Sequence, residues 1–211
     1  MASMSGVVRI GAIDDDRMLL QGLASWLEPL EDVLLVRMAS TVPEYLQDPA
    51  EVEVILLDLN LRDGSNPARN VHELLQTGAA ILVVSTIPDQ EHVLATIEAG
   101  ASGYITKDND LPNLVDFIRA AAQGELAVSP ELAFLLSTDA RPQRPQLSAQ
   151  ESTVLRIYAS GATLAATARK AGVAYGTARE YLERVKRKYT DAGWPTRTKL
   201  ELRERLREEE L

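Results

Sequence analysis

Five polar side chains in the N-terminal half lie at the ends of short apolar runs. They are Asp14 and Asp15 after the run 7–13, Asp58 in the run 53–59, Ser85 at the end of 79–85, and Lys107 after 103–106. If these runs are parallel strands, their carboxyl ends meet at one edge of a sheet, which is where ligands bind in open parallel sheets. We therefore expect the five side chains to meet in one pocket.

The residue types in this pocket favour phosphoryl chemistry. Three carboxylates at one edge repel one another unless a hard divalent cation lies among them, and Mg²⁺ prefers oxygen ligands. Asp58 is the candidate nucleophile, because an Asp carboxylate can form an acyl phosphate. The Ser85 hydroxyl can donate a hydrogen bond to a phosphoryl oxygen, and Lys107 can pair with it as a point charge. The sequence therefore predicts a Mg²⁺-dependent phosphoryl site.

Each residue also has a simpler interpretation. A strand-end Asp can cap the following helix, Lys107 can be a solvated surface charge, and Ser85 can be a turn residue. For any one residue alone this interpretation is the better one. Five such residues at successive strand ends favour the phosphoryl site.

The apolar runs alternate with segments of helical periodicity, which are residues 18–30, 43–48, 68–77, 89–99 and 111–123. Strands buried on both faces and separated by helices form a parallel, doubly wound sheet with right-handed crossovers. We therefore predict an α/β domain over residues 7–123, built on a five-stranded parallel sheet.

At these residues the chain resembles the receiver domains of bacterial two-component response regulators, which have a flavodoxin-like fold. Asp14 and Asp15 in AIDDD resemble the acidic pair of the family, and Asp58 in ILLDLN resembles its phosphoacceptor. Ser85 resembles its conserved hydroxyl residue, and Lys107 in YITKD resembles its invariant lysine.

This resemblance implies that a sensor histidine kinase phosphorylates Asp58. It also implies that the backbone carbonyl of Asn60 completes a metal site with Asp14, Asp15 and Asp58. Tyr104 is then the aromatic switch residue that moves together with Ser85, whereas the alternative for Tyr104 is an ordinary edge-strand aromatic.

The loop after Asp58 departs from the family pattern. Family members usually carry Met-Pro-Gly soon after the acceptor, whereas this chain has Leu61-Arg62-Asp63-Gly64 and its next proline at Pro67. We expect a loop of different shape over the pocket, with altered phosphorylation or dephosphorylation rates, and an ion pair between Arg62 and Asp63.

Charge divides the chain into two parts of opposite sign. The net charge is −9, yet residues 1–140 carry 7 basic against 22 acidic residues, whereas residues 141–211 carry 15 against 9. The first part is therefore at −15 and the second at +6. A basic segment of this kind is suited to the phosphate backbone of nucleic acid.

Residues 124–146 are predicted to be a linker that contains a helix over 125–136. The stretch STDARPQRPQ at 137–146 lacks apolar periodicity and marks the domain boundary. It is short, so we expect the two domains to touch.

Residues 147–211 are predicted to form an all-α unit of four helices. Ser148 and Glu151 have the spacing of a capping box and open the first helix. The four helices are expected at 149–160, 163–171, 175–189 and 198–209, with a tight turn at Gly172 between the second and the third. This order of helix, turn and helix predicts a DNA-binding helix-turn-helix.

The third of these helices combines a core-facing stripe of Ala178, Leu182 and Val185 with many charged residues. The segment 147–202 resembles the output domain of the NarL/FixJ (LuxR-type) subclass, which implies that this helix enters the major groove of promoter DNA. The predicted DNA-binding residues are Thr177, Arg179, Glu180, Glu183, Arg184, Lys186, Arg187 and Lys188. Arg179 is the candidate base contact, and the cations at 184 and 186–188 are candidate phosphate contacts. The alternative is a solvated charged face.

The resemblance further implies a homodimer in the active state, formed through Leu200, Leu202 and Leu206 in the last helix, although a terminal helix packed on its own domain is the alternative. The sequence contains no cysteine and no apolar stretch of membrane-spanning length, so we expect a cytoplasmic protein without membrane association.

We therefore expect a response regulator transcription factor and not an enzyme, since a phosphatase of the haloacid-dehalogenase type would need a second Asp where Asn60 stands. The rival hypothesis is a DNA-binding regulator with a degenerate receiver that is controlled without phosphorylation.

Overall fold

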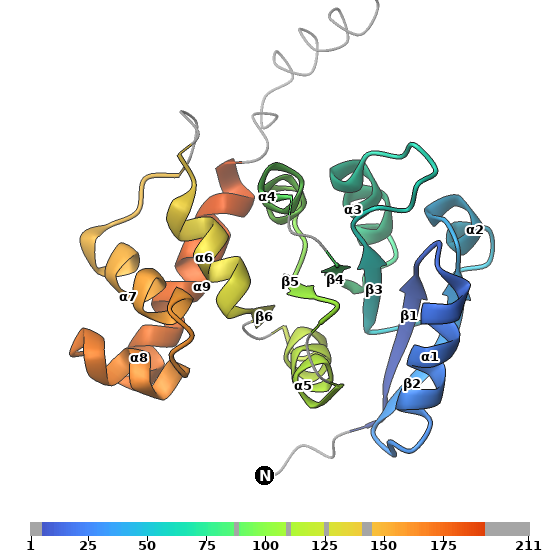
Figure 1. The fold of residues 1–211 in the computed structure, drawn as a ribbon, viewed down its shortest axis with the longest axis horizontal. Coiled ribbons are helices and arrows are strands. Elements are labelled where there is room, and N and C mark those ends of the chain that lie inside the picture. Colours follow the sequence, from blue (N-terminus) through green and yellow to red (C-terminus); the bar gives the residue numbers. More distant parts are fainter. Residues whose placement is uncertain (1–5, 87–88, 109–110, 125–126, 141–144, 193–211) are drawn as a thin grey trace, which may run out of the picture.

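The computed structural model describes residues 6–86, 89–108, 111–124, 127–140 and 145–192. An α/β part and a helical part lie side by side (Figure 1). Within the described residues, no helix is long and apolar enough to cross a membrane.

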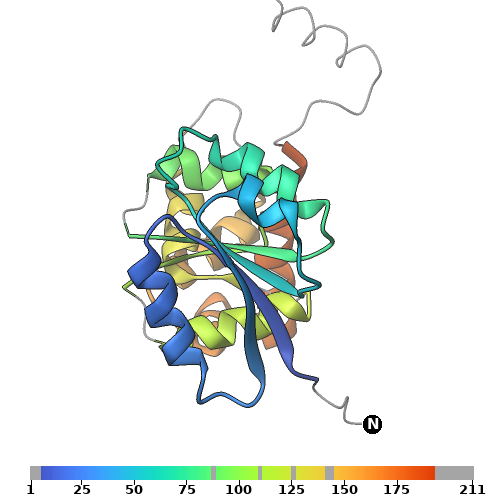
Figure 2. The same ribbon diagram turned by 90° about the vertical axis from the view of Figure 1, so that its right-hand side faces the viewer.

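The sheet consists of parallel strands in the order β2-β1-β3-β4-β5-β6. The strands are β1 (Val8–Ile13), β2 (Val33–Ala39), β3 (Val54–Asp58), β4 (Ala80–Ser85), β5 (Gly103–Thr106) and β6 (Ala127–Val128). The predicted α/β class and the five predicted strands, β1 to β5, are confirmed. The twist of the sheet and the helices on both of its faces are visible in Figure 2.

The sixth strand corrects the prediction of a five-stranded sheet and of a helix beginning at 125. Ala127 and Val128 pair in parallel with Gly103 and Tyr104. The helix α6 (Pro130–Thr138) begins only after Ser129, whose hydroxyl accepts a hydrogen bond from the Leu132 backbone N–H. A proline in the first turn and a serine N-cap fix this start, so the two residues before Ser129 remain extended and pair with the sheet.

Helices cover both faces of the sheet. The helices are α1 (Arg17–Leu27), α2 (Val42–Gln47), α3 (Pro67–Leu75), α4 (Gln90–Glu98) and α5 (Leu111–Ala122). On one face, α1 and α5 bury Leu20, Leu27 and Ile118 against strand residues such as Leu56. Strand residues of the opposite parity, such as Leu57, face the second core, as expected for strands buried on both faces.

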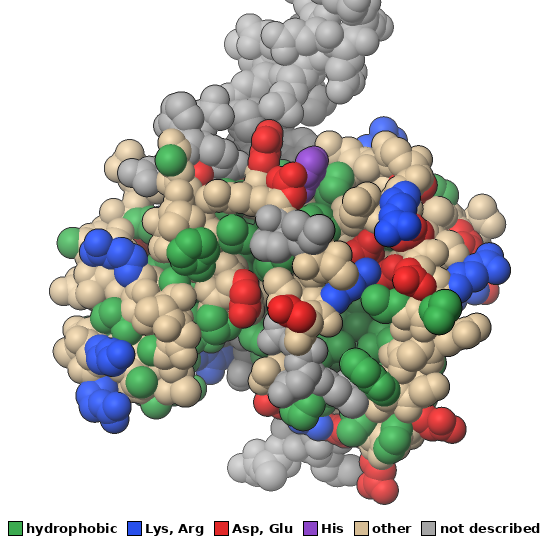
Figure 3. Space-filling model, in the orientation of Figure 1, with side chains coloured by type: hydrophobic (Ala, Val, Ile, Leu, Met, Phe, Trp, Pro, Cys, Tyr) green, Lys and Arg blue, Asp and Glu red, His purple; other side chains and the backbone are tan. Residues whose placement is uncertain are grey.

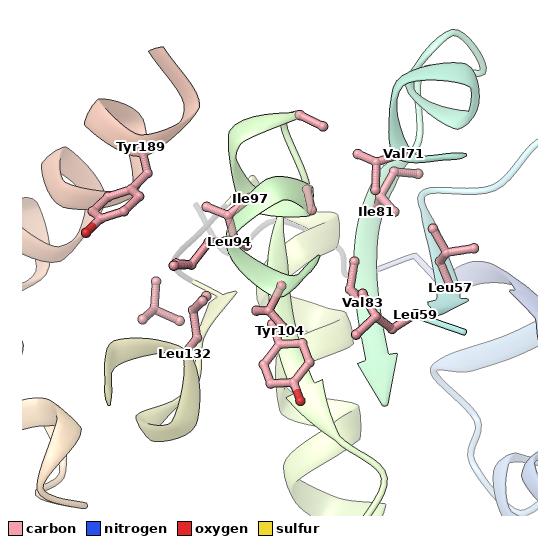
Figure 4. Close-up of a cluster of buried hydrophobic side chains, with 14 of the residues drawn as sticks. Leu57, Leu59, Val71, Ile81, Val83, Leu94, Ile97, Tyr104, Leu132 and Tyr189 are labelled. Carbon is pink, nitrogen blue, oxygen red and sulfur yellow. The ribbon is translucent and has the colours of Figure 1, made fainter. Parts of the chain in front are cut away.

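The second core continues from this face of the sheet into the helical part of the chain. It joins Leu94 and Ile97 of α4, Tyr104 of β5, Leu132 of α6, and Tyr189 of α9 in one cluster of buried side chains (Figure 4). The prediction that the two parts touch is therefore confirmed, and they share apolar contacts instead of facing each other across solvent.

The helical part contains α7 (Ala149–Ala159), α8 (Leu164–Ala171) and α9 (Tyr175–Ala192). The capping box is present, with Ser148 Oγ accepting from the Glu151 backbone N–H and the Glu151 carboxylate accepting from the Ser148 backbone N–H. Gly172 ends α8 in the left-handed conformation (φ 68°), which glycine adopts without a steric penalty. The predicted helix 198–209, including its three leucines, lies outside the described residues.

Candidate functional site: an acidic pocket and a basic helix

The structure brings the three predicted carboxylates together at the carboxyl edge of the sheet. One oxygen each of Asp14, Asp15 and Asp58 lies within 4.8 Å of the others. Asp58 ends β3, while Asp14 and Asp15 follow β1, its hydrogen-bonded neighbour. Three clustered carboxylate oxygens are the donor set that Mg²⁺ prefers, so these residues fit the predicted metal. Asn60 lies beside them, and its backbone N–H donates to Asp58 Oδ2 at 3.2 Å.

Lys107 joins two of these carboxylates. Its Nζ lies 2.6 Å from Asp14 Oδ2 and 3.0 Å from Asp58 Oδ1, and all three side chains are largely buried. Burial alone would lower the pKa of Lys107, but its hydrogen bonds to Asp14 and Asp58 outweigh burial and raise that pKa. Lys107 is therefore a fixed positive charge at the candidate phosphoacceptor.

Burial dominates the ionisation of Asp58. Desolvation raises the pKa of this carboxyl above its ordinary value of 3.8, and the Asp14 charge acts in the same direction. The hydrogen bond and the charge of Lys107, together with the Asn60 backbone, oppose the rise without cancelling it. The ionised nucleophile is thus held at a cost in free energy, an arrangement common at functional sites.

Ser85 lies at the same edge, at the end of β4, where it is buried and pairs with Thr106 of β5. The backbone N–H of Lys107 donates to the Ser85 carbonyl at 2.8 Å, so the two predicted phosphate-binding residues are joined through the backbone. This position is the one that the sequence predicts for a hydroxyl facing a phosphoryl group on Asp58.

Tyr104 is fully buried in β5, beneath the contact between the two parts of the chain (Figure 4). Its hydroxyl is buried without a hydrogen-bond partner among the described residues. Burial, with the negative charges of Glu131 and Asp108, raises the pKa of Tyr104 to about 12. Burying a hydroxyl without a hydrogen-bond partner costs free energy, so the buried position of the Tyr104 side chain carries an energetic cost.

The atypical loop forms a different ion pair from the one predicted. Arg62 Nε lies 3.6 Å from Asp15 Oδ2, whereas Asp63 Oδ1 accepts a hydrogen bond from the Ser65 backbone N–H at 2.9 Å. Arg62 has a left-handed backbone (φ 53°), unusual for a residue with a side chain. The turn therefore directs the arginine to the acidic cluster, a contact between loops 47 positions apart that the sequence could not reveal.

The basic helix α9 packs against α4 of the α/β part. Lys186 Nζ donates to the Ser102 carbonyl at 2.7 Å. The Thr190 hydroxyl, which has one hydrogen to donate, lies 3.2 Å from the Ile97 carbonyl and 3.1 Å from the Lys186 carbonyl of its own helix. Burial in this contact lowers the pKa of Lys186, although the negative charge of Glu183 partly opposes it. One predicted phosphate contact is thus held against the α/β part in this arrangement.

The other predicted DNA-binding residues occupy varied environments on α9. Arg179 pairs with Glu183 at 3.0 Å, and the Arg184 guanidinium lies 4.6 Å from the centre of the Tyr181 ring. Glu180 and Arg187 are exposed, and Thr177 is half-buried.

Lys188, another predicted phosphate contact, has partners within the helical part in this arrangement. Its Nζ lies 2.6 Å from the buried carboxylate of Glu151 and 3.0 Å from the Gln146 carbonyl. Burial would raise the pKa of Glu151, but hydrogen bonds from Lys188 and Ser148 and the positive charge of Lys188 lower it. The capping-box glutamate thus also ties α9 to the start of α7, which the local sequence pattern alone does not reveal.

Comparison with known proteins identifies the family. Residues 10–119 match the family of response regulator receiver domains. The chain belongs to the response regulator family. It is 30% identical over 185 residues to the uncharacterized transcriptional regulatory protein YvfU of Bacillus subtilis, a match that covers 85% of this chain and 89% of YvfU.

Two further similarities extend over both parts of this response regulator. The nitrate/nitrite response regulator NarL of Escherichia coli is 27% identical over 83% of this chain and 86% of NarL. The crystal structure of the response regulator ChrA superposes with a TM-score of 0.54 and 26% identity, covering 89% of this chain and 96% of ChrA. The protein is therefore a response regulator transcription factor with a receiver domain and a helical output region.

Proposed function

We propose that phosphorylation of Asp58 controls whether α9 of this response regulator can bind promoter DNA. The observation that carries the proposal is the pairing of Lys107 with Asp58 and Asp14 in a buried cluster of carboxylates. This cluster supplies a nucleophile, a fixed cation and an oxygen donor set at one point, as phosphoryl transfer requires.

The chemical step takes place between Asp58 and a phosphohistidine of a sensor kinase. An Asp58 carboxylate oxygen forms a P–O bond while the P–N bond of phosphohistidine breaks, and the departing imidazole nitrogen keeps the electron pair. Lys107 and the Ser85 hydroxyl stabilise the transferred phosphoryl oxygens. Asp14, Asp15, Asp58 and the Asn60 carbonyl would hold Mg²⁺, which would supply positive charge to neutralise the phosphoryl oxygens.

The charge added at Asp58 disturbs the environment of Lys107, which is bonded through its backbone to Ser85 at the end of β4. The next strand, β5, carries Tyr104, and Tyr104 packs in the same cluster as the side chains of α4 and α9. A movement of Ser85 and Tyr104 therefore has a short route to the contact between α4 and α9.

The contact itself supports a closed state before phosphorylation. Lys186 donates to a receiver carbonyl, the Thr190 hydroxyl lies within hydrogen-bond distance of another, and both residues lie on the helix proposed to bind DNA. The opposite net charges of the two parts favour the same closure, so salt is expected to loosen it. Release of α9 then allows Arg179, Arg184 and Arg187 to meet DNA and two copies to bind a two-fold site. We place the domain limits at residues 7–123 and 147–211, joined by the linker 124–146.

The test combines a small acyl-phosphate donor and Mg²⁺ with intact-mass measurement and DNA binding to duplexes selected from a random pool. The unmodified chain should gain one phosphoryl group and bind the selected duplex about tenfold more tightly, a change of about 1.4 kcal/mol. Asp58→Asn should gain neither, whereas Asp63→Asn, which removes a nearby exposed carboxylate, should behave as the unmodified chain. Equal modification of Asp58→Asn and the unmodified chain would contradict the proposal.

One observation favours the rival function of a regulator that works without phosphorylation. Arg62 approaches Asp15, so the acidic cluster already has two cations beside it, counting Lys107. If the chain binds its selected duplex but takes up no phosphoryl group at any Mg²⁺ concentration, the rival function is correct.

A further inference from the structure

A cavity of about 260 Å³ lies between α1, α5 and the sheet, next to the acidic pocket. Its walls are almost wholly apolar and include Leu19, Leu23, Leu56, Ile105 and Leu114. Figure 3 shows green side chains lining a hollow, with acidic and basic side chains gathered beside it. The hollow is open to solvent on one side, and an apolar space of this size has room for a small ligand.

Two features of α1 keep the cavity open. Gly22 lines it, and a Cβ added to Gly22 would meet no atom within 4 Å. Glycine inside a helix is less favourable than alanine, so the helix is not optimised for its own stability here. One turn further along α1, the Trp26 side chain lines the same space and is 57% exposed.

The polar end of the cavity has an excess of negative charge. Asp14, Asp58 and Lys107 line it, and Asp15 lies within 4.8 Å of the two aspartates. Three carboxylates face Lys107 within the cluster and Arg62 at its edge, which leaves one negative charge unbalanced. A ligand that is complementary to this cavity therefore has an apolar body and a single cationic group at one end.

From this combination we infer that the cavity is a binding site for an arylalkyl ammonium compound of one or two rings. The size of the body follows from the volume, because a cavity of about 150 Å³ accommodates benzene and drug-sized ligands need about 300 Å³ or more. The aromatic body lies between α1 and α5, and the ammonium group lies beside Asp14 and Asp58.

A ligand bound in this cavity weakens Mg²⁺ binding, because its ammonium group and Mg²⁺ neutralise the same carboxylates. The two affinities are linked reciprocally: Mg²⁺ weakens the ligand by the factor by which the ligand weakens Mg²⁺. The binding site itself goes beyond the proposed function and does not depend on it. Only its consequence, that the ligand holds the receiver unphosphorylated, rests on that function.

Three compounds of matched shape test the inference on the full chain: phenethylamine (cation), propylbenzene (neutral) and hydrocinnamate (anion). Trp26 fluorescence reports binding in a Trp194→Phe background, since the sequence has two tryptophans. Without Mg²⁺ or a phosphoryl donor, phenethylamine should bind about tenfold more tightly than either analogue. Mg²⁺ should weaken its binding by a similar factor.

Gly22→Leu fills the cavity from α1 and should weaken phenethylamine binding at least about tenfold. Gly22→Ala is the matched control, because it removes the same glycine but leaves most of the space, and it should bind within about twofold of the unmodified chain. Leu114→Trp fills the space from α5 and should repeat the loss, and thermal melting confirms that each variant folds.

Binding that follows this pattern supports the site even if Asp58 is never phosphorylated. The inference is overturned if none of the three compounds binds, if hydrocinnamate or propylbenzene binds as tightly as phenethylamine, or if folded Gly22→Leu and Leu114→Trp bind as the unmodified chain does.

Discussion

Replacing Asp58 with asparagine should stabilise the fold while abolishing phosphoryl acceptance. Coulomb's law at an effective dielectric constant of about 20 gives an attraction of about 5.5 kcal/mol between Asp58 and Lys107 at 3.0 Å. Repulsion from Asp14 and Asp15, each within 4.8 Å, is about 3.5 kcal/mol per carboxylate. Attraction and repulsion thus largely cancel, and the cost of burying the carboxylate, which is the main cause of the raised pKa of Asp58, decides the sign. The neutral isostere removes this cost.

The expected gain at pH 7 without Mg²⁺ is on the order of 1 kcal/mol, or a melting temperature about 2–4 °C higher. The sign agrees with the raised pKa of Asp58. An acid whose pKa is raised by folding contributes stability below its unfolded pKa and loses that contribution as pH rises through its folded pKa. The advantage of Asp58→Asn should therefore shrink as pH falls toward 3.8.

Thermal melting by circular dichroism across this pH range measures both effects. Glu51→Gln is the control for loss of one charge, because Glu51 is exposed and precedes β3 at the edge of the sheet opposite the pocket. Mg²⁺ should stabilise the unmodified chain more than Asp58→Asn. A variant that melts at or below the temperature of the unmodified chain at pH 7, or whose advantage does not change with pH, would refute this reasoning.

Three other substitutions have outcomes set by single contacts. Ser148→Ala removes the N-cap of α7 and should lower the free energy of unfolding by about 1 kcal/mol in denaturant titrations. An unchanged denaturation midpoint would contradict this prediction. Gly103→Ala places a Cβ 2.0 Å from the Ala127 carbonyl oxygen, so it should detach β6 from β5 and lower the free energy of unfolding by about 1–3 kcal/mol. The variant should be cleaved faster by protease near α6, and equal proteolysis rates would argue against this effect. Tyr104→Phe removes a buried hydroxyl without a described partner and should stabilise the fold by about 1 kcal/mol; a lower melting temperature would mean that the hydroxyl is satisfied.

The sequence predicts the features that depend on local pattern. Apolar periodicity and residue type predict the five strands β1 to β5, the position of Asp58 beside Asp14 and Asp15, and the capping box at Ser148. Parallel strands bring their carboxyl ends together whatever the loops do, so the acidic pocket is predictable without knowledge of any distance.

The features that the sequence does not predict depend on contacts between distant segments. The strand β6 has only two residues, and its pairing with β5 depends on the close approach allowed by Gly103. The pairing of Arg62 with Asp15 requires the left-handed turn at Arg62, and the bond from Lys186 to Ser102 spans 84 positions. No periodicity within one segment encodes such contacts.

The distance between α4 and α9 before and after phosphorylation tests the central claim most directly. The chain contains no cysteine, so spin labels can be attached at Glu91→Cys and Arg187→Cys, both exposed positions on these helices. In pulsed electron paramagnetic resonance, the unphosphorylated chain should give one narrow, short distance, and the acyl-phosphate donor with Mg²⁺ should replace it with a longer, broader distribution that Asp58→Asn never shows. A chain that is fully phosphorylated on Asp58 and keeps the short distance would contradict the account.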